Sequence, residues 1–206
     1  MKKLFFVIAM ALLAATPSAS AAEKLIITHA AGTPQVIRGS EVLEAKVGMI
    51  CQTGDTLKTP TPECQIDLSM NNIAGCRVLP SSEVKISGGS QKDMKVEITS
   101  GNAILNLKKL PKDSTFRVET PTAVAAVRGT QFWGRVDGQS PASSVTTFAV
   151  REGVVNIFSK KADKTFSLQK GQALDLSQDN TAPEIRPALE AELQALAQAS
   201  SIKTSA

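Results

Sequence analysis

The sequence has few of the side chains on which metal and nucleophile chemistry most often depends. Its 206 residues include one histidine, His29, one tryptophan and no tyrosine. Zinc, copper and non-haem iron sites usually use two or three imidazoles, and a Ser-His-Asp or Cys-His system needs at least one. Asp55, Asp67 and Asp93 form no recognisable acid–base pair. The composition therefore predicts no catalytic residues, no metal site and no cofactor, and it disfavours an enzyme.

The N-terminus has the pattern of a secretory leader. Two lysines precede the apolar run 4–15, and the small-x-small pattern of Ala19 and Ala21 follows it, which is the pattern that signal peptidase reads. A run of this length is too short to cross a bilayer core of about 30 Å as a helix. We therefore predict that residues 1–21 are a cleaved signal peptide, that cleavage falls between Ala21 and Ala22, and that the mature chain is periplasmic or secreted.

The mature chain carries little net charge. The whole chain has a formal charge of +4, and two of its basic residues lie in the predicted leader, which leaves 185 residues with a charge of +2. A near-neutral chain gives no electrostatic argument for a nucleic-acid partner, and its length suits one domain with a substantial core. No later apolar run approaches the roughly 20 residues that a membrane helix needs. We therefore predict no transmembrane anchor in the mature chain.

Residues 22–177 alternate between short apolar stretches and turn residues. Stretches rich in Val, Ile and Leu, such as 64–68, 84–86 and 154–157, recur at intervals near ten residues, with Gly, Asn, Asp and Pro between them. This spacing is typical of all-β proteins rather than of βαβ units, and no helical period competes with it before residue 180. We predict a single all-β domain of many short strands, arranged as a β-sandwich, a roll or a short solenoid.

Residues 178–206 differ from the rest of the chain. Ile185, Leu189, Leu193 and Leu196 recur at four- and three-residue steps in a stretch rich in Ala, Glu and Gln, which favours an amphipathic helix. We predict one C-terminal helix at about 184–199, followed by a polar tail. Its narrow apolar stripe suits packing onto one face or end of the β domain, and a docking helix for a partner is the alternative.

Five short motifs occur in order along the β region. They read GDTLKT from Gly54, VLPSS from Val78, TPTAVAAVRGTQF from Thr120, EGVV from Glu152 and GQ from Gly171. This succession closely resembles the FecR-type domain, which is named after the periplasmic part of the ferric-citrate regulator. The matches extend from about Gly32 to Gln172. The resemblance implies an extracytoplasmic, non-enzymatic β domain that contacts other proteins.

The resemblance also limits what is carried over from the family. Full-length regulators of this kind resemble three-part proteins, with a cytoplasmic anti-sigma segment, one membrane span, and the FecR-type domain followed by a signalling module. Here the predicted leader stands in place of the first two parts, and about 34 residues follow Gln172. We therefore do not carry over control of a sigma factor.

The motif residues also have a reading that needs no family. Glycine supplies positive φ in tight turns and bulges, aspartate accepts backbone N–H bonds from two residues farther along the chain, and a residue before proline is pushed to extended geometry. We predict a turn at 54–55, a corner at 120–121, a bulge at 129 that turns Phe132 into the core, and a hairpin turn at 152–153. The residues given this structural role are Gly54, Asp55, Thr120, Pro121, Gly129, Thr130, Gly153 and Gly171.

Three cysteines, Cys51, Cys64 and Cys76, lie in the mature chain. In an oxidising compartment a disulfide is expected, and one thiol is then left over. Cys64 and Cys76 flank the Asn71-Asn72 turn on strands that a hairpin would place side by side, so we favour that pair. The pairs Cys51–Cys64 and Cys51–Cys76 remain alternatives. A metal site lacks both C-x-x-C spacing and histidine partners.

Two basic clusters lie near predicted turns. They consist of Lys108, Lys109 and Lys112, and of Lys160, Lys161 and Lys164. Lysine commonly protects strand edges in contact with water, and contact with an anionic envelope polymer is the alternative. Our leading hypothesis is a binding or scaffold module of the cell envelope whose partner is a protein or such a polymer. The alternative is a periplasmic sensor or regulatory subunit that relays a signal to a separate membrane partner.

Overall fold

The computed structural model describes residues 24–90, 92–138 and 140–204. The predicted signal peptide, with Ala21 and Ala22, lies outside the described residues. The described strands, in chain order, are β1 (Leu25–Ala31), β2 (Gln35–Arg38), β3 (Glu41–Glu44), β4 (Thr56–Thr59), β5 (Gln65–Met70), β6 (Ala74–Val78), β7 (Ser82–Gly89), β8 (Asp93–Leu107), β9 (Thr115–Glu119), β10 (Ala123–Val127), β11 (Gln131–Asp137), β12 (Val145–Glu152), β13 (Val154–Ser159), β14 (Lys164–Gln169), β15 (Gln172–Ser177) and β16 (Ile185–Pro187). A 3₁₀ turn, η1 (Pro141–Ser143), precedes β12, and the chain ends in α1 (Glu190–Ala197) and η2 (Gln198–Ser201).

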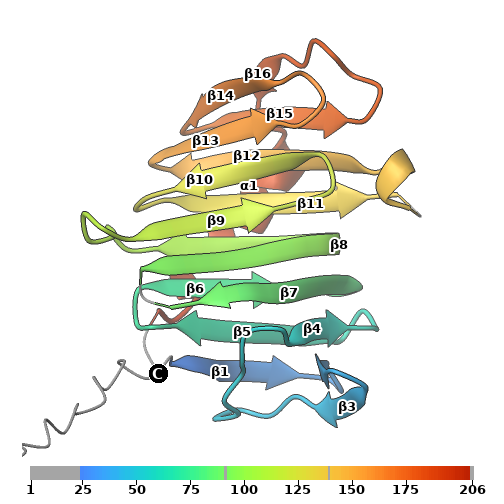
Figure 1. Ribbon diagram of the computed structural model, residues 1–206, viewed down its shortest axis with the longest axis vertical. Helices are drawn as coiled ribbons and strands as arrows, with labels where there is room; N and C mark the ends of the chain where they lie inside the picture. The colour runs from blue at the N-terminus through green and yellow to red at the C-terminus, as the bar shows by residue number, and fades with distance from the viewer. Residues whose placement is uncertain (1–23, 91, 139, 205–206) are drawn as a thin grey trace, which may run out of the picture.

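These strands form one open, continuous sheet that is folded into two layers (Figure 1). Layer A has the order β1-β5-β6-β8-β11-β12-β15-β16. Layer B has the order β3-β2-β4-β7-β8-β9-β10-β13-β14. The pairs named here are antiparallel except β8–β9, which is parallel. The all-β prediction is confirmed, and the described strands form a single sheet that is not closed.

Strand β8 belongs to both layers. Its residues 93–100 pair with β7 and β9 in layer B, and its residues 101–106 pair with β11 in layer A. The change of layer falls at Gly101, which has φ +74°. A Cβ atom at this position would overlap Ser81 and Ser82. Glycine is therefore required here both by the left-handed backbone and by the close approach of the neighbouring chain.

The main core lies between the two layers. Alternation along the strands sends residues such as Val84, Ile86, Phe132 and Phe148 inward, where they are fully buried. The layers touch directly, since a Cβ atom on Gly134 of layer A would lie 2.9 Å from Ile98 Cδ1, on the half of β8 that belongs to layer B. Burial of apolar side chains on this scale supplies most of the favourable free energy of folding.

The C-terminal helix is shorter than the spacing predicts. Ile185–Pro187 forms β16, which pairs with β15, so the helix begins at Glu190 rather than near residue 184. Inside α1, only Glu192 and Leu196 are buried. The helix packs on the outer face of layer A, opposite the main core, as Figure 1 shows behind β11 and β12. In the described residues no helix has the length and apolarity needed to cross a bilayer.

The predicted disulfide between Cys64 and Cys76 is not formed. All three cysteines lie in the described part of the chain as buried free thiols. The hairpin around the Asn71-Asn72 turn exists, but its register pairs Leu68 with Cys76. Cys64 precedes Leu68 by four residues, which is about 13 Å along an extended strand, whereas a disulfide needs Cα atoms within about 7 Å. The turn is therefore where the sequence indicates, and the register separates the two thiols.

Candidate interaction surface

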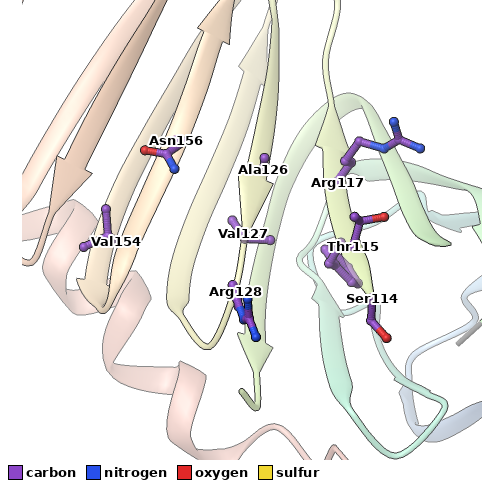
Figure 2. A pocket seen from close by; sticks show the side chains of 9 residues that line it. Ser114, Thr115, Arg117, Ala126, Val127, Arg128, Val154 and Asn156 are labelled. Carbon is purple, nitrogen blue, oxygen red and sulfur yellow. The ribbon is translucent and has the colours of Figure 1, made fainter. Parts of the chain in front are cut away.

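The outer face of layer B carries an open groove of about 280 Å³. Three neighbouring strands contribute to it, and Figure 2 shows side chains from β9, β10 and β13 standing around it. The lining residues are Ser114, Thr115, Phe116, Arg117, Ala126, Val127, Arg128, Val154 and Asn156.

Strand register explains why the groove forms at this place. Ala126 pairs with Arg117 of β9 on one side and with Asn156 of β13 on the other. A methyl group between two longer side chains leaves a depression on a surface from which side chains stand out roughly perpendicular to the sheet. On β13, Val154 lines the groove and is 48% exposed, and Phe158, beyond Asn156 and outside the lining, is 39% exposed. The groove therefore has a small floor and an apolar border.

The charged side chains that line the groove are both basic. The residues that line it include Arg117 and Arg128 and, among the described residues, no carboxylate. Arg117 Nη2 donates to Asp93 Oδ1 at 2.7 Å, and Arg128 Nη2 donates to the Leu110 carbonyl at 3.2 Å. Both guanidinium groups keep further N–H donors beyond the bonds that hold them. A ligand that combines apolar groups with a carboxylate matches this border.

The rest of the outer face of layer B is different. Toward the N-terminal strands it carries cross-strand ion pairs, with Lys58 Nζ 3.3 Å from Glu83 Oε2 and Lys95 Nζ 3.3 Å from Glu119 Oε1. Such exposed pairs contribute little to stability, but they keep a sheet face solvated. A third cross-strand pair, between Arg117 and Asp93, lies at the groove.

Two of the sequence motifs meet at one end of the molecule. A Cβ atom on Gly153 would lie 2.7 Å from the Gly129 carbonyl oxygen and 2.7 Å from Thr130 Cγ2. These turns line a second depression of about 300 Å³ together with Lys108 and Lys109 of the first basic cluster. The pairing of β11 with β12 is irregular between residues 131 and 132, next to the predicted bulge.

Asp55 of the first motif is a buried ion-pair partner. It accepts hydrogen bonds from Arg38 Nε at 2.9 Å and from Arg38 Nη2 at 2.7 Å, and from the Gln52 backbone N–H at 2.9 Å. The hydrogen bond to Asp55 raises the pKa of Arg38 further above its ordinary value. Gly54, with φ +101°, forms the turn beside it. Asp55 thus accepts a backbone bond from a residue before the turn, not after it as the turn motif suggests.

The Thr120-Pro121 corner is held by hydroxyl groups. Thr120 Oγ1 accepts from the Ala123 backbone N–H at 3.1 Å and from Thr146 Oγ1 at 3.0 Å. Thr122 Oγ1 in turn donates to Thr146 Oγ1 at 2.6 Å. All three threonines are buried, so this network ties the corner to β12 of layer A.

The remaining predicted residues lie in separate places. Gly171, with φ +78°, donates its backbone N–H to the Val150 carbonyl at 2.8 Å. In the second basic cluster, Lys160 Nζ donates to the Thr120 carbonyl at 2.6 Å, and Lys164 Nζ lies 5.3 Å from the centre of the Phe166 ring. His29 is exposed on β1.

The thiols differ in their surroundings. Burial raises the pKa of Cys76 to about 12, with a smaller contribution from Asp67, and burial also raises the pKa of Cys51 to about 12. At Cys64 burial acts in the same direction, but hydrogen bonds from Thr61 and Thr33 outweigh it and lower the pKa. Within the described residues, no group of three or more His, Cys, Asp or Glu side chains is placed to hold a metal ion.

Comparison with known proteins gives one family and one fold. Residues 55–156 match the family described as FecR protein, which covers four of the five motifs in part or in full. None of the curated proteins matches this chain.

Two crystal structures share the fold. Both are of a "putative anti-sigma factor" from Parabacteroides distasonis, and each superposes with a TM-score of 0.57 over 69% of this chain. Their sequences are 16% and 15% identical to this one. The matched region spans 64% of the length of those chains.

Proposed function

Because this chain carries a domain of the FecR family across residues 55–156, we propose that it is a non-enzymatic regulatory module of the bacterial envelope. It relays a signal by binding a partner protein through the groove of layer B. Two findings support regulation through protein contact: the family itself, and the description of the proteins with the same fold as anti-sigma factors. Binding of a sigma factor is not part of the proposal.

The observation that carries the proposal is the apolar border of the groove. Val154 lines the groove and Phe158 follows Asn156 on the same strand, outside the lining; they point away from the main core and are 48% and 39% exposed, at outward positions where one-sided sheets usually carry polar residues. Exposed apolar groups gathered beside basic ones mark sites of protein contact more often than isolated ones do. The partner that fits is a segment with apolar side chains and at least one carboxylate, which Arg117 and Arg128 would bind.

The predicted leader, residues 1–21, supports an extracytoplasmic location. In that compartment a domain with no described membrane helix would act as a separate subunit, and its partner would supply any connection to the membrane.

A crosslinking experiment tests this function. A photo-reactive phenylalanine analogue replaces Phe158, which lies next to the groove on β13, or, as a matched control, Lys85, which is exposed on the same face of layer B farther from the groove. We expect position 158 to give a crosslinked protein product in the native envelope that position 85 does not. Addition of Ala126→Glu, which places a carboxylate between the arginines, should remove that product. Identical products at both positions, or a product unchanged by Ala126→Glu, would contradict the proposal.

A second candidate function rests on the other depression. Lys108 and Lys109 lie beside the Gly129-Thr130 turn around a cavity of about 300 Å³ that Glu152 also lines, and the two lysines would bind an anionic envelope polymer. Its binding would weaken strongly as salt rises to physiological levels, because exposed charges are then screened over about 8 Å. The polymer would be retained by Ala126→Glu and lost on replacing both lysines with glutamine.

A further inference from the structure

We propose that the outer face of layer A is a helix-binding surface that the chain's own C-terminal segment, residues 188–204, occupies reversibly. An amphipathic helix of a partner protein, with the same acidic start and the same apolar spacing, takes the place of this segment. The surface lies on the opposite side of the molecule from the groove of layer B, so the inference does not depend on the proposed function.

The shape of the face fits a packed segment. Three positions of this face carry small side chains and are buried beneath or beside the segment. They are Gly75, Ala149 and Ala173. A Cβ atom on Gly75 would lie 2.7 Å from Ile202 Cγ2 and 2.8 Å from the Lys203 carbonyl oxygen. The close approach at this strand therefore depends on glycine, and the face is shaped for a segment that lies directly on the backbone.

Apolar contact comes from one stripe of the segment. Leu196 and Ala199 are fully buried and Ile202 is 3% exposed, and they pack with Ile104 and Trp133 of layer A. The three segment residues follow one another at steps of three, which places them on one side of a helical turn. This is the apolar spacing that a competing helix must reproduce.

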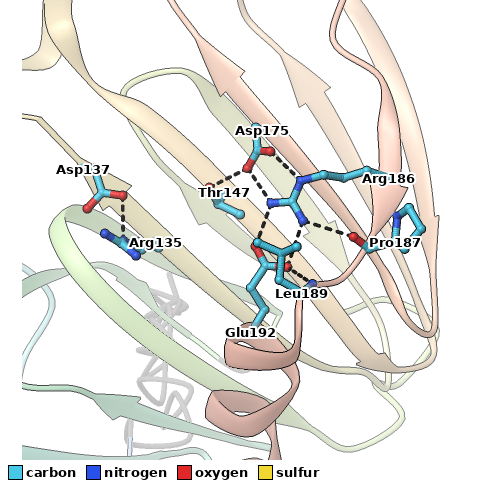
Figure 3. Close-up of polar contacts among 8 residues, drawn as sticks. All are labelled: Arg135, Asp137, Thr147, Asp175, Arg186, Pro187, Leu189 and Glu192. Carbon is cyan, nitrogen blue, oxygen red and sulfur yellow. Dashed lines mark hydrogen bonds and ion pairs between the residues drawn. The ribbon is translucent and has the colours of Figure 1, made fainter.

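Arginines of layer A surround the stripe and define the charge of the occupant. Arg186 donates to Glu192 Oε1 at 2.7 Å and to Glu192 Oε2 at 3.0 Å, and it also binds Asp175 (Figure 3). Arg151 Nη1 donates to the carbonyls of Leu196 at 3.1 Å and Ala197 at 3.2 Å. A cation is thereby placed at the C-terminal end of the helix dipole, where it is favourable.

At the far end, Arg77 Nη1 donates to Ser201 Oγ at 3.1 Å while its other nitrogens bind Asp67. Arginines thus lie on three sides of the stripe, two of them also paired with Asp67 and Asp175, and the segment offers a carboxylate near the start of its helix and carbonyl groups at the end. Charge complementarity selects an occupant with an acidic first turn.

The segment is held weakly enough to leave. Helix α1 has eight residues, and isolated helices of this length are not stable in water. Its other leucine, Leu193, is 39% exposed, and Leu189 just before it is 59% exposed. The bond from Arg151 to the Ala197 carbonyl lies at the surface, and the Arg186 side chain is 29% exposed, so salt weakens the arginine contacts in part. The helix therefore depends on the sheet for its existence, and it forms and docks together.

Trp133 provides a hydrogen-bond donor that the docked segment does not use. Its indole Nε1 is buried and has no hydrogen-bond partner in the described structure. A buried donor without an acceptor is unfavourable, so an occupant that places an oxygen there gains a bond that residues 188–204 do not make. Trp133 is also the single tryptophan of the chain, and its fluorescence therefore reports on this face alone.

Competition between the segment and a free peptide tests the inference. Full-length protein with Leu196→Asp has a segment that cannot dock, and the probe is a synthetic peptide with the native sequence of residues 188–204. We expect the peptide to bind this variant at least about tenfold more tightly than it binds the unmodified protein, because the surface is then unoccupied. Binding should shift Trp133 emission to shorter wavelength and protect it from acrylamide. Leu193→Asp, on the exposed side of the same helix, is the matched control and should behave as the unmodified protein does.

The inference is overturned if the Leu196→Asp protein keeps its β-sheet signal but does not bind the native peptide, or binds equally well a peptide that carries the same substitution. If Leu196→Asp does not fold, hydrogen exchange of the unmodified protein decides. Amides of residues 190–201 should then exchange through a local opening with less dependence on denaturant than amides of β11 and β12. Exchange of both groups by one common unfolding reaction would overturn the inference.

Two arginine substitutions make the hydrogen-exchange measurement more specific. Arg186→Gln removes two bonds to Glu192 and should speed exchange in residues 190–201 several-fold. Arg135→Gln removes a pair with Asp137, 2.6 Å long, that lies on the same layer apart from the helix (Figure 3). It should leave the exchange of residues 190–201 unchanged. Equal effects of the two variants would contradict the inference that Arg186 specifically stabilises the docked helix.

Discussion

The two outer faces of the folded sheet solve the same problem in different ways. Both layers carry apolar side chains on the face that points away from the main core. On layer A the chain covers them with its own residues 190–202, so that Trp133 is 5% exposed. On layer B no described segment covers Val154 and Phe158. An outward apolar residue therefore has a different meaning on each face, because only layer B leaves a place for another molecule without a rearrangement.

The basic residues follow the same division. On layer A the arginines donate to groups of the C-terminal segment, as Arg151 does to Leu196 and Ala197. On layer B Arg117 and Arg128 are held at the border of the groove by Asp93 and Leu110. The arginines of layer A use their N–H donors to bind the covering segment. The arginines of layer B keep N–H donors that are not used in the bonds described.

Leu196→Ala should lower the stability of the covered face more than the substitutions that follow, since it removes the central contact of that face. A buried leucine truncated to alanine costs about 2–5 kcal/mol when the cavity does not collapse, and part of that cost appears here as undocking of the helix. Denaturant unfolding and Trp133 fluorescence measure the two parts. Leu193→Ala, on the exposed side of the helix, should change stability by less than about 0.5 kcal/mol, and equal losses in both variants would show that the helix is not held by Leu196.

Gly75→Ala should have the next largest effect. The new methyl group would meet Ile202 and the Lys203 backbone, and overpacking of this kind costs about 1–3 kcal/mol. Thermal unfolding should report the loss, and acrylamide should quench Trp133 more strongly. Ala126→Val adds carbon to the uncovered face of layer B, where it should cost less than about 0.5 kcal/mol. If both substitutions were equally harmless, the covered face would not be tightly packed.

Acid should loosen the covered face. Burial acts to raise the pKa of Asp175, but hydrogen bonds from Arg186 and Thr147 outweigh it and hold the pKa of this carboxyl below its ordinary value of 3.8. A depressed pKa contributes stability above the ordinary value and loses it as pH falls through the folded-state value. We therefore expect Trp133 to become more accessible to acrylamide as pH falls below about 4. In Asp175→Asn this acid response should shrink, and an unchanged response would assign it to another group.

Phe158→Ser should have the smallest effect on stability. The side chain is 39% exposed on the uncovered face, so the free energy of unfolding should change by less than about 0.5 kcal/mol. Binding of the partner found by crosslinking should nevertheless weaken. A large loss of stability in this variant would mean that the groove border belongs to the core, and the contrast between the two faces would then disappear.

Most of the fold could be predicted from two features of the sequence, the alternation of apolar and polar residues and the turn residues. Inward positions such as Val84 and Ile86, separated by Lys85, have the two-residue period of a strand, and short-range turn chemistry placed the Asn71-Asn72 hairpin correctly. What could not be obtained is register, because it depends on how distant strands fit together in the core. The Cys64–Cys76 prediction failed for that reason.

The helix start shows a second limit. Ile185 fits the helical spacing of Leu189 and Leu193, but the same residue also suits a strand, and pairing with Leu174 of β15 decides in favour of the strand. The groove of layer B escaped prediction because Ala126 and Asn156 are distant in sequence. A signal was present, since the outward positions 124, 126, 154 and 158 are occupied by valine, alanine and phenylalanine, but it becomes visible only once inward and outward positions are known.

The membership of β8 in both layers has a consequence for cooperativity. A strand whose first half completes one layer and whose second half completes the other cannot be removed from either without opening both. The domain therefore has no boundary at which it could be divided into two independently folding halves, although its layers look separate. Global unfolding should accordingly proceed as a single all-or-none transition of both layers, which the undocking of the short C-terminal helix can precede.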